Sequence, residues 1–387
     1  MISILYFILK WKYGFWIMQP VFHIYNINYM LFPPGIIEHS LPERNKYTDF
    51  NKISTSVVSQ LTSLQKYQLT RFIKANYLRE RDNVFMPQSS NILPYFTGHS
   101  EKSFISFYHE DTHLFDSKQG NVITHKTVSG CITSRPLNVV IYKNRQENSF
   151  RAYYVDYLCV HKEKRKNGIA PKLIQTHHYQ QRHINHSIVV SLFKREEELT
   201  GIVPLCVYLT YGFPLDTWRK PNEMAGNYKV LEINKHNVRF LIDFVLKKCQ
   251  DDDFDLFIYP DWSNVLELIN THNIFIYAVL CDNEIVCCYF FRKSCTQVKK
   301  GLEVLSCFAS LSNCDDSIFI QGFKICFWKI AFDHHFGFSA IENISHNHII
   351  IDHIKEHTSP VITSPSAYFF YNFAYPTFEP KKTLILN

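Results

Sequence analysis

The sequence predicts a mixed α+β protein with a largely antiparallel sheet, packed as one body. Amphipathic helices alternate with strand-like apolar runs. The order of helix, antiparallel strands and helix in the first half occurs again in outline in the second half, without close sequence repetition. No low-complexity linker separates the halves. With 387 residues, 46% of them hydrophobic, the chain can bury a sizeable core.

The first half is expected to begin with a helix around residues 56–78. There, apolar residues recur at near 3.6-residue spacing, namely Val57, Leu61, Leu64, Leu69 and Phe72. Strands are expected over 127–134, 137–142 and 149–160. In the last of these, alternation places Val155, Tyr157 and Cys159 on one face and Asp156, Leu158 and Val160 on the other.

The second half is expected to repeat this order. Helices are predicted over 238–249 and 319–335, and between them lie the strand-like runs 274–281, 284–291 and 301–311.

Charge and cysteine usage exclude several classes of protein. A net charge of +6, with bases and acids interspersed, does not indicate a dedicated nucleic-acid binder. The 11 cysteines include no CxxC pair, which is typical of buried free thiols in an intracellular, reducing compartment; we expect a cytoplasmic protein. The N-terminal apolar run over 2–9 is too short to span a bilayer. We interpret it as a buried or clamping segment, with interfacial membrane contact as the alternative, and expect no integral membrane association.

The stretch YVDYLCVHKEKRKNGIAP, over 154–171, changes from a strand into a basic turn and then a helix. Gly168 and Ala170 let the backbone come close to a ligand, and free N–H groups at a helix start attract an anion such as a pyrophosphate. Pro171 fits the first helical turn, where its missing N–H costs nothing. The alternative is a solvated basic turn before an ordinary helix.

A strand, a basic glycine turn and a helix in this order resemble the acyl-CoA pyrophosphate site of GNAT-type acyltransferases. With its flanks, the motif resembles the glycylpeptide N-tetradecanoyltransferases, the N-myristoyltransferase family, of which the chain is identified as a divergent member. The likeness runs in order along nearly the whole chain through YGFW with QPV (13–16 and 19–21), NYLRERDNVF (76–85), VSGCITSRPLNVVIY (128–142), YLCVHK with IAP, and SAYFFYNFAYP (366–376) with the tail LILN.

The resemblance implies two GNAT-like halves related by pseudo-two-fold symmetry around a saddle-shaped sheet. Residues 1–212 would bind acyl-CoA, and residues 213–387 would contribute the peptide site and a catalytic C-terminus. The expected acyl-CoA contacts are Tyr13, Gly14, Phe15, Trp16, Leu158, Cys159, Val160, Arg165, Lys166, Asn167, Gly168, Ile169 and Ala170. An aromatic N-terminal anchor in the core is the alternative for residues 13–16.

The implied reaction is transfer of myristoyl from myristoyl-CoA to the N-terminal glycine amine of a protein or peptide. The resemblance places oxyanion-stabilising N–H groups at Tyr157 and Leu158. It makes the α-carboxylate of Asn387 the base; such a group has an ordinary pKa of roughly 3.3 to 3.7 and must act by proximity. From sequence alone, a frayed, solvated C-terminus is the default. No metal is expected, and no cofactor beyond myristoyl-CoA.

The peptide half of the site departs more from the family pattern. The implied peptide-binding residues are Asp82, Phe85 and Tyr208, but Arg79 and Arg81 reverse the charge of a segment that is acidic in the family. Three outcomes stay open: a transferase with altered peptide preference, an acyltransferase acting on another amine, or a pseudoenzyme that binds acyl-CoA. We expect a monomer whose partners are myristoyl-CoA and proteins or peptides with N-terminal glycine, and no nucleic acid.

Four histidines crowd SHNHIIIDHIKEH, namely His346, His348, His353 and His357. They invite a metal-site reading, but the segment has neither a cysteine partner nor an HExxH pattern. Exposed histidines on a helix and its approach loop are the expected account.

Overall fold

The computed structural model describes residues 14–78, 83–116, 121–143, 146–196, 201–216, 218–251, 253–298 and 301–387. Side chains are described for these residues except 113–116, 121–124, 143 and 146. The expectations for residues 1–13, including Tyr13, and for Asp82 lie outside the described residues.

The described helices and strands alternate along the chain as the sequence predicts. The helices are α2 (Ile27–Leu31), α3 (Ser63–Asn76), α4 (Ser89–Ile92), α5 (Ile169–Ile184), α6 (Val238–Gln250), α7 (Trp262–Asn270), α8 (Asp316–Asp333) and α9 (Asn347–Lys355), with short 3-10 turns that include η1 (Trp16–Met18), η2 (Val58–Gln60) and η3 (Leu93–Phe96). The strands are β1 (Gly35–Ile36), β2 (Ile53–Val57), β3 (Val84–Phe85), β4 (Phe104–Asp116), β5 (Asn121–Lys143), β6 (Gln146–Val160), β7 (Val190–Glu196), β8 (Cys206–Pro214), β9 (Tyr228–Glu232), β10 (Leu256–Tyr259), β11 (Ile274–Cys281), β12 (Glu284–Val298), β13 (Leu302–Ser312), β14 (Phe338–Glu342), β15 (Ile362–Tyr371), β16 (Phe373–Ala374) and β17 (Thr383–Ile385).

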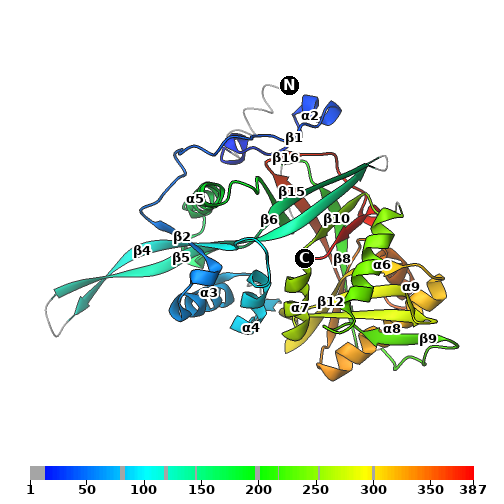
Figure 1. Ribbon diagram of the computed structural model, residues 1–387. Helices are drawn as coiled ribbons and strands as arrows, with labels where there is room; N and C mark the ends of the chain where they lie inside the picture. The colour runs from blue at the N-terminus through cyan, green and yellow to red at the C-terminus, as the bar shows by residue number, and fades with distance from the viewer. Residues whose placement is uncertain are drawn as a thin grey trace.

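One large, mostly antiparallel sheet joins the two halves, which confirms the predicted α+β class. Its main path runs β17-β10-β5-β6-β7-β15-β8-β14-β13-β12-β11-β9. In the first half, β6 leads through α5 to the parallel strand β7; in the second, β13 leads through α8 to the parallel strand β14. Figure 1 shows α5 and α3 on opposite sides of the long β4–β5 hairpin, with the end of the chain near the middle of the molecule.

The first helix is shorter than predicted. Val57 ends β2, and the 3-10 turn η2 precedes Leu61, so the predicted helix over 56–78 becomes α-helical only at residue 63. Thr62 explains the start: its hydroxyl accepts the N–H of Gln65, whose side chain in turn accepts the N–H of Thr62, forming a capping box. The spacing of the apolar residues predicts the burial of Val57, Leu61, Leu69 and Phe72 but not the exposure of Leu64, and it does not show where helical hydrogen bonding begins.

A β-bulge breaks the predicted alternation in β6. Asp156 pairs with Thr133 and Cys159 with Cys131, so two residues of β6 oppose one residue of β5. Tyr157 takes up the extra residue with φ of +46°. The prediction that Val155 shares a face with Tyr157 and Cys159 is therefore wrong: Val155 packs beside Leu158 and Val160 against α5, while Tyr157 and Cys159 belong to the cluster under α3.

The carboxyl end of the chain is buried and ordered, contrary to the default of a frayed terminus. Strand β17 pairs in parallel with β10, and Leu384, Ile385 and Leu386 are at most 4% exposed. Residue 212, where the first half was predicted to end, lies within β8. Among the described residues, no helix is long and apolar enough to cross a membrane.

Candidate active site

The first cavity lies between β6, β7 and the face of α5, and has a volume of about 720 Å³. Gly14, Phe15 and Trp16 close it on one side. Its other lining residues include Ile132, Val155, Leu158, Ala170, Pro171, Ile174, His177, His178, Gln181, Phe193 and Tyr371. Most of this wall is apolar, so the cavity is suited to an acyl chain.

The second cavity, of about 510 Å³, lies on the side of β12, β14 and β15. Its wall is more polar and contains the charged groups Arg135, Arg292, Lys293 and Glu342. Phe85, Tyr95, Thr210, Ser306 and Ser366 also line it.

The two cavities share one wall, formed by residues that line both: Tyr77, Leu78, Tyr154, Asp156, Tyr157, Lys194 and Glu196. This wall exists because β6 and β7 pair only between 152–155 and 190–193. Beyond Val155, β6 and β7 separate. The bulge also leaves Tyr157 and Leu158 without partners on β5. At Tyr157 and Leu158 the backbone of β6 is thus free of regular sheet pairing on both sides.

Side chains of β5 satisfy the carbonyl groups that the bulge displaces. Thr133 Oγ1 donates to Asp156 O at 3.0 Å, and Cys131 Sγ donates to Tyr157 O at 3.5 Å. The N–H of Tyr157 donates to the carboxylate of Asp156, at 2.7 Å from Oδ1. The N–H of Tyr157 therefore already has an acceptor, the carboxyl group of Asp156.

Asp156 is an ionisable group at the junction of the two cavities. Burial raises the pKa of its carboxyl above the ordinary value, while Arg135 and the N–H of Tyr157 act in the opposite direction. Burial also raises the pKa of the Tyr157 phenol well above its ordinary value. The shared wall consequently carries two acidic side chains, Asp156 and Glu196, and the basic Lys194 beside its tyrosine rings.

The basic turn has the predicted form. Lys166 and Gly168 are both left-handed, with φ of +66° and +72°, and Gly168 is the residue before the first turn of α5. Arg165 braces the turn, because its Nη2 donates to Asn76 O at 2.8 Å. Arg165, Lys166, Asn167 and Gly168 are exposed and lie outside the wall of the first cavity.

The other predicted acyl-CoA contacts divide into two groups. Gly14, Phe15, Trp16, Leu158 and Ala170 line the first cavity, and the indole of Trp16 stacks on Phe193 with ring centroids 5.8 Å apart. Cys159, Val160 and Ile169 lie behind that wall, where they pack into the hydrophobic clusters beside α3 and α5.

A buried charge network surrounds Glu342 at the back of the second cavity. Its Oε1 accepts from Arg292 Nη2 at 2.8 Å, and its Oε2 accepts from Tyr208 Oη at 2.5 Å and pairs with Lys194 Nζ at 3.5 Å. Burial alone would raise the pKa of Glu342, but Lys194 and Arg292 together hold it below its ordinary value. Arg292 Nη1 also donates to the main-chain oxygen of Asn387.

Among the predicted peptide contacts, Phe85 lines the second cavity, where its ring lies near those of Tyr77 and Tyr157. Tyr208 does not line it; this phenol lies behind the wall and anchors Glu342. Asn387, the predicted base, likewise lies behind Arg292 rather than in either cavity wall.

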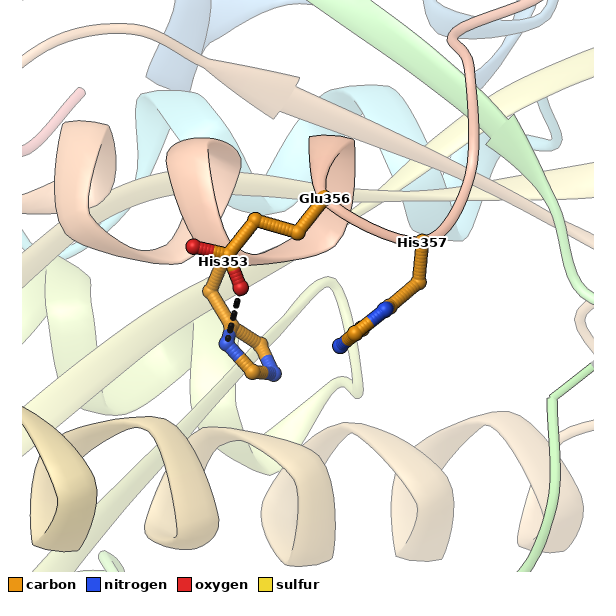
Figure 2. A group of neighbouring side chains, drawn as sticks. All are labelled: His353, Glu356 and His357. Atoms are coloured by element: carbon orange, nitrogen blue, oxygen red, sulfur yellow. Dashed lines mark ion pairs between the residues drawn. The ribbon is translucent and has the colours of Figure 1, made fainter.

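The histidine-rich tail forms α9 and the turn after it. The rings of His353 and His357 and the carboxylate of Glu356 come together, with ligand atoms within 4.8 Å of one another (Figure 2). Glu356 Oε2 lies 3.6 Å from His353 Nδ1, and none of the three residues lines either cavity. His346 and His348 are instead engaged separately, with Ser312 N–H and Ser345 O.

The sequence interpretation missed the α5 face of the first cavity and the ionic groups of the second. Ile174, His177, His178 and Gln181 recur at helical spacing after the glycine turn, and this periodicity could have identified them. Glu342 and Arg135 come from distant segments, and no local pattern marked them.

Comparisons with known proteins give the fold. No protein-family model matches the chain, and no curated protein sequence matches it. Among solved structures, Saccharomyces cerevisiae N-myristoyltransferase with bound myristoyl-CoA aligns with a TM-score of 0.72 at 12% identity, over 95% of this chain and 94% of that one. The same enzyme with myristoyl-CoA and inhibitors gives 0.73 at 12% identity, over 96% and 93%.

A tandem GNAT protein from the clavulanic acid biosynthesis pathway aligns with a TM-score of 0.54 at 10% identity, over 84% of this chain and 99% of that one. The predicted arrangement of two GNAT-like halves is therefore confirmed, and the chain has the fold of the N-myristoyltransferases.

Proposed function

We propose that the protein is an acyl-CoA-dependent N-acyltransferase that transfers a myristoyl group to the N-terminal glycine amine of a protein or peptide. The observation that carries this proposal is the shared wall. An apolar cavity and a polar cavity meet where the backbone of β6 is unpaired on both sides. A thioester held in the first cavity and an amine held in the second would meet at Asp156 and Tyr157.

The first cavity supports binding of the acyl-CoA. Its wall is mostly apolar, and the yeast structures of the same fold hold myristoyl-CoA. The turn at Lys166 to Gly168 leads directly into α5, whose free N–H groups and positive dipole end favour a diphosphate. Three bases of the turn, Lys164, Arg165 and Lys166, are exposed toward solvent and could pair with phosphate oxygens.

Oxyanion stabilisation is assigned to the N–H groups of Tyr157 and Leu158. Donors fixed before the reaction stabilise developing charge without reorganisation. Because the Tyr157 N–H donates to Asp156 Oδ1, it can serve the thioester oxyanion only when that hydrogen bond is shared or released. When the amine binds Asp156, the N–H of Tyr157 would be released to donate to the oxyanion.

The base is assigned to the α-carboxylate of Asn387. Arg292 connects this residue to the second cavity, because the guanidinium lines the cavity and donates to the Asn387 main-chain oxygen at 2.9 Å. That oxygen belongs to the α-carboxylate, so an ammonium in the cavity would have to displace the Arg292 guanidinium to reach it. The proton leaves the amine as the new amide bond forms and CoA departs as the thiol.

The test is transfer of labelled myristoyl from its CoA thioester to peptides with N-terminal glycine. Each peptide has a matched control with an acetylated N-terminus, which removes the nucleophile and leaves the rest of the peptide unchanged. Labelled amide product with free glycine and none with the blocked peptide supports the proposal. Tight acyl-CoA binding with no transfer to any amine would instead identify a binding protein that has lost catalysis.

A further inference from the structure

Arg135 is a buried basic residue with an unsatisfied guanidinium nitrogen in the described part of the chain. It extends from β5 into the wall of the second cavity, and only 3% of the residue is exposed. Its Nη1 atom is buried and has no hydrogen-bond partner among the described residues. An ionised group in this position costs several kcal/mol unless an opposite charge or acceptor compensates it.

Two aromatic rings hold the guanidinium in place. Its central carbon lies 4.9 Å from the ring centroid of Tyr95 and 5.1 Å from that of Tyr154. Both rings also line the second cavity. Stacking satisfies the faces of the guanidinium, but its N–H groups lie in its plane and still require acceptors. The side chain is thus fixed before any ligand arrives.

The other basic side chains of the cavity have carboxylate partners. Arg292 and Lys194 both bind Glu342, and Lys293 pairs with Glu303 at 3.6 Å. Within the described part of the chain, Arg135 is therefore the basic group of this cavity that lacks an ion-pair partner. A carboxylate monoanion could pair with this guanidinium, whereas a phosphate dianion would be repelled more strongly by the nearby acidic side chains Asp156, Glu196 and Glu342.

We propose that Arg135 binds a carboxylate carried by the acceptor, while Asp156 holds the acceptor amine at the wall shared by the two cavities. The inference rests on the proposed function, because it supposes that the second cavity receives the amine. Asp156 lines both cavities, and Arg135 lines only the second, so the amine would face the thioester and the carboxylate would lie beyond it.

The acceptor class is therefore a compound with an amine and a carboxylate a few bonds apart. A short glycyl compound can supply the carboxylate from its own C-terminus, and a longer peptide can supply it from an acidic side chain near the N-terminus. Both sources present the same bidentate acceptor to the guanidinium.

The test compares matched probes that differ only in this carboxylate, with calorimetric binding to the full chain as the readout. Glycyl-aspartamide is compared with glycyl-asparaginamide for the side-chain source, and glycyl-alanine with glycyl-alaninamide for the C-terminal source. Because a charge-assisted hydrogen bond contributes roughly 1.5 to 3 kcal/mol, the carboxylate probe of at least one pair should bind about tenfold or more tightly.

Arg135→Gln should reduce that preference to near unity, while Arg151→Gln should retain it. Arg151 is the matched control because it lies on β6, pairs with Glu101 at 3.3 Å and lines neither cavity. Arg135→Lys, which keeps the charge but not the fork of donors, should give an intermediate preference. If Arg135→Gln does not fold, the Arg135→Lys variant and the probe pairs on the unmodified chain decide the question.

Equal affinity within both probe pairs, or a preference that survives Arg135→Gln, would overturn the inference. Binding is measured without turnover, so the two proposals can fail separately. A carboxylate preference without acyl transfer would support the anion site at Arg135 and contradict the proposed acyltransferase activity. Acyl transfer without a carboxylate preference would support the acyltransferase activity and contradict the anion site.

Discussion

Arg292 donates from Nη1 to the main-chain oxygen of Asn387 at 2.9 Å and from Nη2 to Glu342 Oε1 at 2.8 Å. One guanidinium thus connects the last residue of the chain to a buried carboxylate in the wall of the second cavity. Tyr368 adds a further contact, since its hydroxyl lies 3.2 Å from Asn387 Oδ1. The chain end is held by named partners, and these partners make its proposed catalytic role testable.

Extending the chain by three residues after Asn387 should abolish acyl transfer. The extension replaces the α-carboxylate by a neutral amide and leaves the proposed amine without a base. Myristoyl-CoA should still bind with unchanged affinity, because the first cavity does not include the chain end. Steady-state transfer and equilibrium acyl-CoA binding are measured on both proteins. Undiminished transfer by the extended chain would rule out the carboxylate as base.

Glu342→Gln should destabilise the fold strongly. The change leaves the partly buried Lys194 and Arg292 beside a neutral group; breaking a fully buried ion pair typically costs about 3 to 5 kcal/mol, and a loss near the lower end is expected here. The matched control is Glu232→Gln, because Glu232 pairs with Lys329 at 3.6 Å on the surface, where such a pair contributes at most about 1 kcal/mol. Urea unfolding of the three proteins gives both differences. Similar small losses in both variants would contradict the description of the network.

The stabilisation that Glu342→Gln removes should depend on pH. The pKa of Glu342 is lower in the folded than in the unfolded chain, so its ionisation stabilises the fold fully above the unfolded pKa. That contribution is lost as pH falls through the folded pKa. The difference in unfolding free energy between the unmodified chain and Glu342→Gln should stay constant from pH 7 to about 5 and shrink below about pH 4.3. A difference that grows on acidification would mean that the pKa of Glu342 is higher in the folded than in the unfolded chain.

Gly168→Ala should weaken acyl-CoA binding through the backbone alone. A Cβ at this position would meet no atom within 4 Å, but the φ of +72° costs an L-residue roughly 1 to 2 kcal/mol. Gly201→Ala is the control, since it has equally open space and no positive φ. Acyl-CoA affinity should fall by up to about tenfold in the first variant and not in the second. Equal affinities would mean that the turn does not shape the ligand site.

Trp16 should report the arrival of the acyl-CoA. Its indole stacks on Phe193 and lines the first cavity, so a bound ligand changes its surroundings. Tryptophan fluorescence should change on titration with myristoyl-CoA, and Trp16→Phe should remove most of that change. Trp262→Phe, altered on α7 away from both cavities, should keep it. A full signal in the Trp16 variant would place the ligand elsewhere.

Much of the fold could be predicted because its signals are local. Apolar patterns located α6 and α8 closely, and Gly168 marked the start of α5 correctly. The bulge at Tyr157 could not be predicted, since its cause is the pairing of β6 with β5 and not the residues of β6 alone. This one extra residue reversed the expected faces of the strand where the two cavities meet.

The candidate site divides in the same way. Short sequence motifs predict four residues of the first cavity, namely Phe15, Trp16, Leu158 and Ala170. Arg135 and the two tyrosines that stack on it, Tyr95 and Tyr154, come from separate segments of the chain. Only the tertiary structure therefore reveals this buried charge. Ionic groups paired across a sheet leave no periodic signal, and the acceptor side of the site was accordingly the part that the sequence described least well.

The most direct test of the central claim is the structure of the protein with a non-transferable analogue of myristoyl-CoA in which a methylene group separates the sulfur from the acyl carbonyl. The account predicts the acyl chain in the first cavity, the diphosphate at Lys166 to Gly168, and the carbonyl oxygen of the acyl group within hydrogen-bond distance of the N–H of Tyr157 or Leu158. An analogue bound outside the first cavity, or one whose carbonyl points away from the shared wall, would contradict acyl transfer at this site.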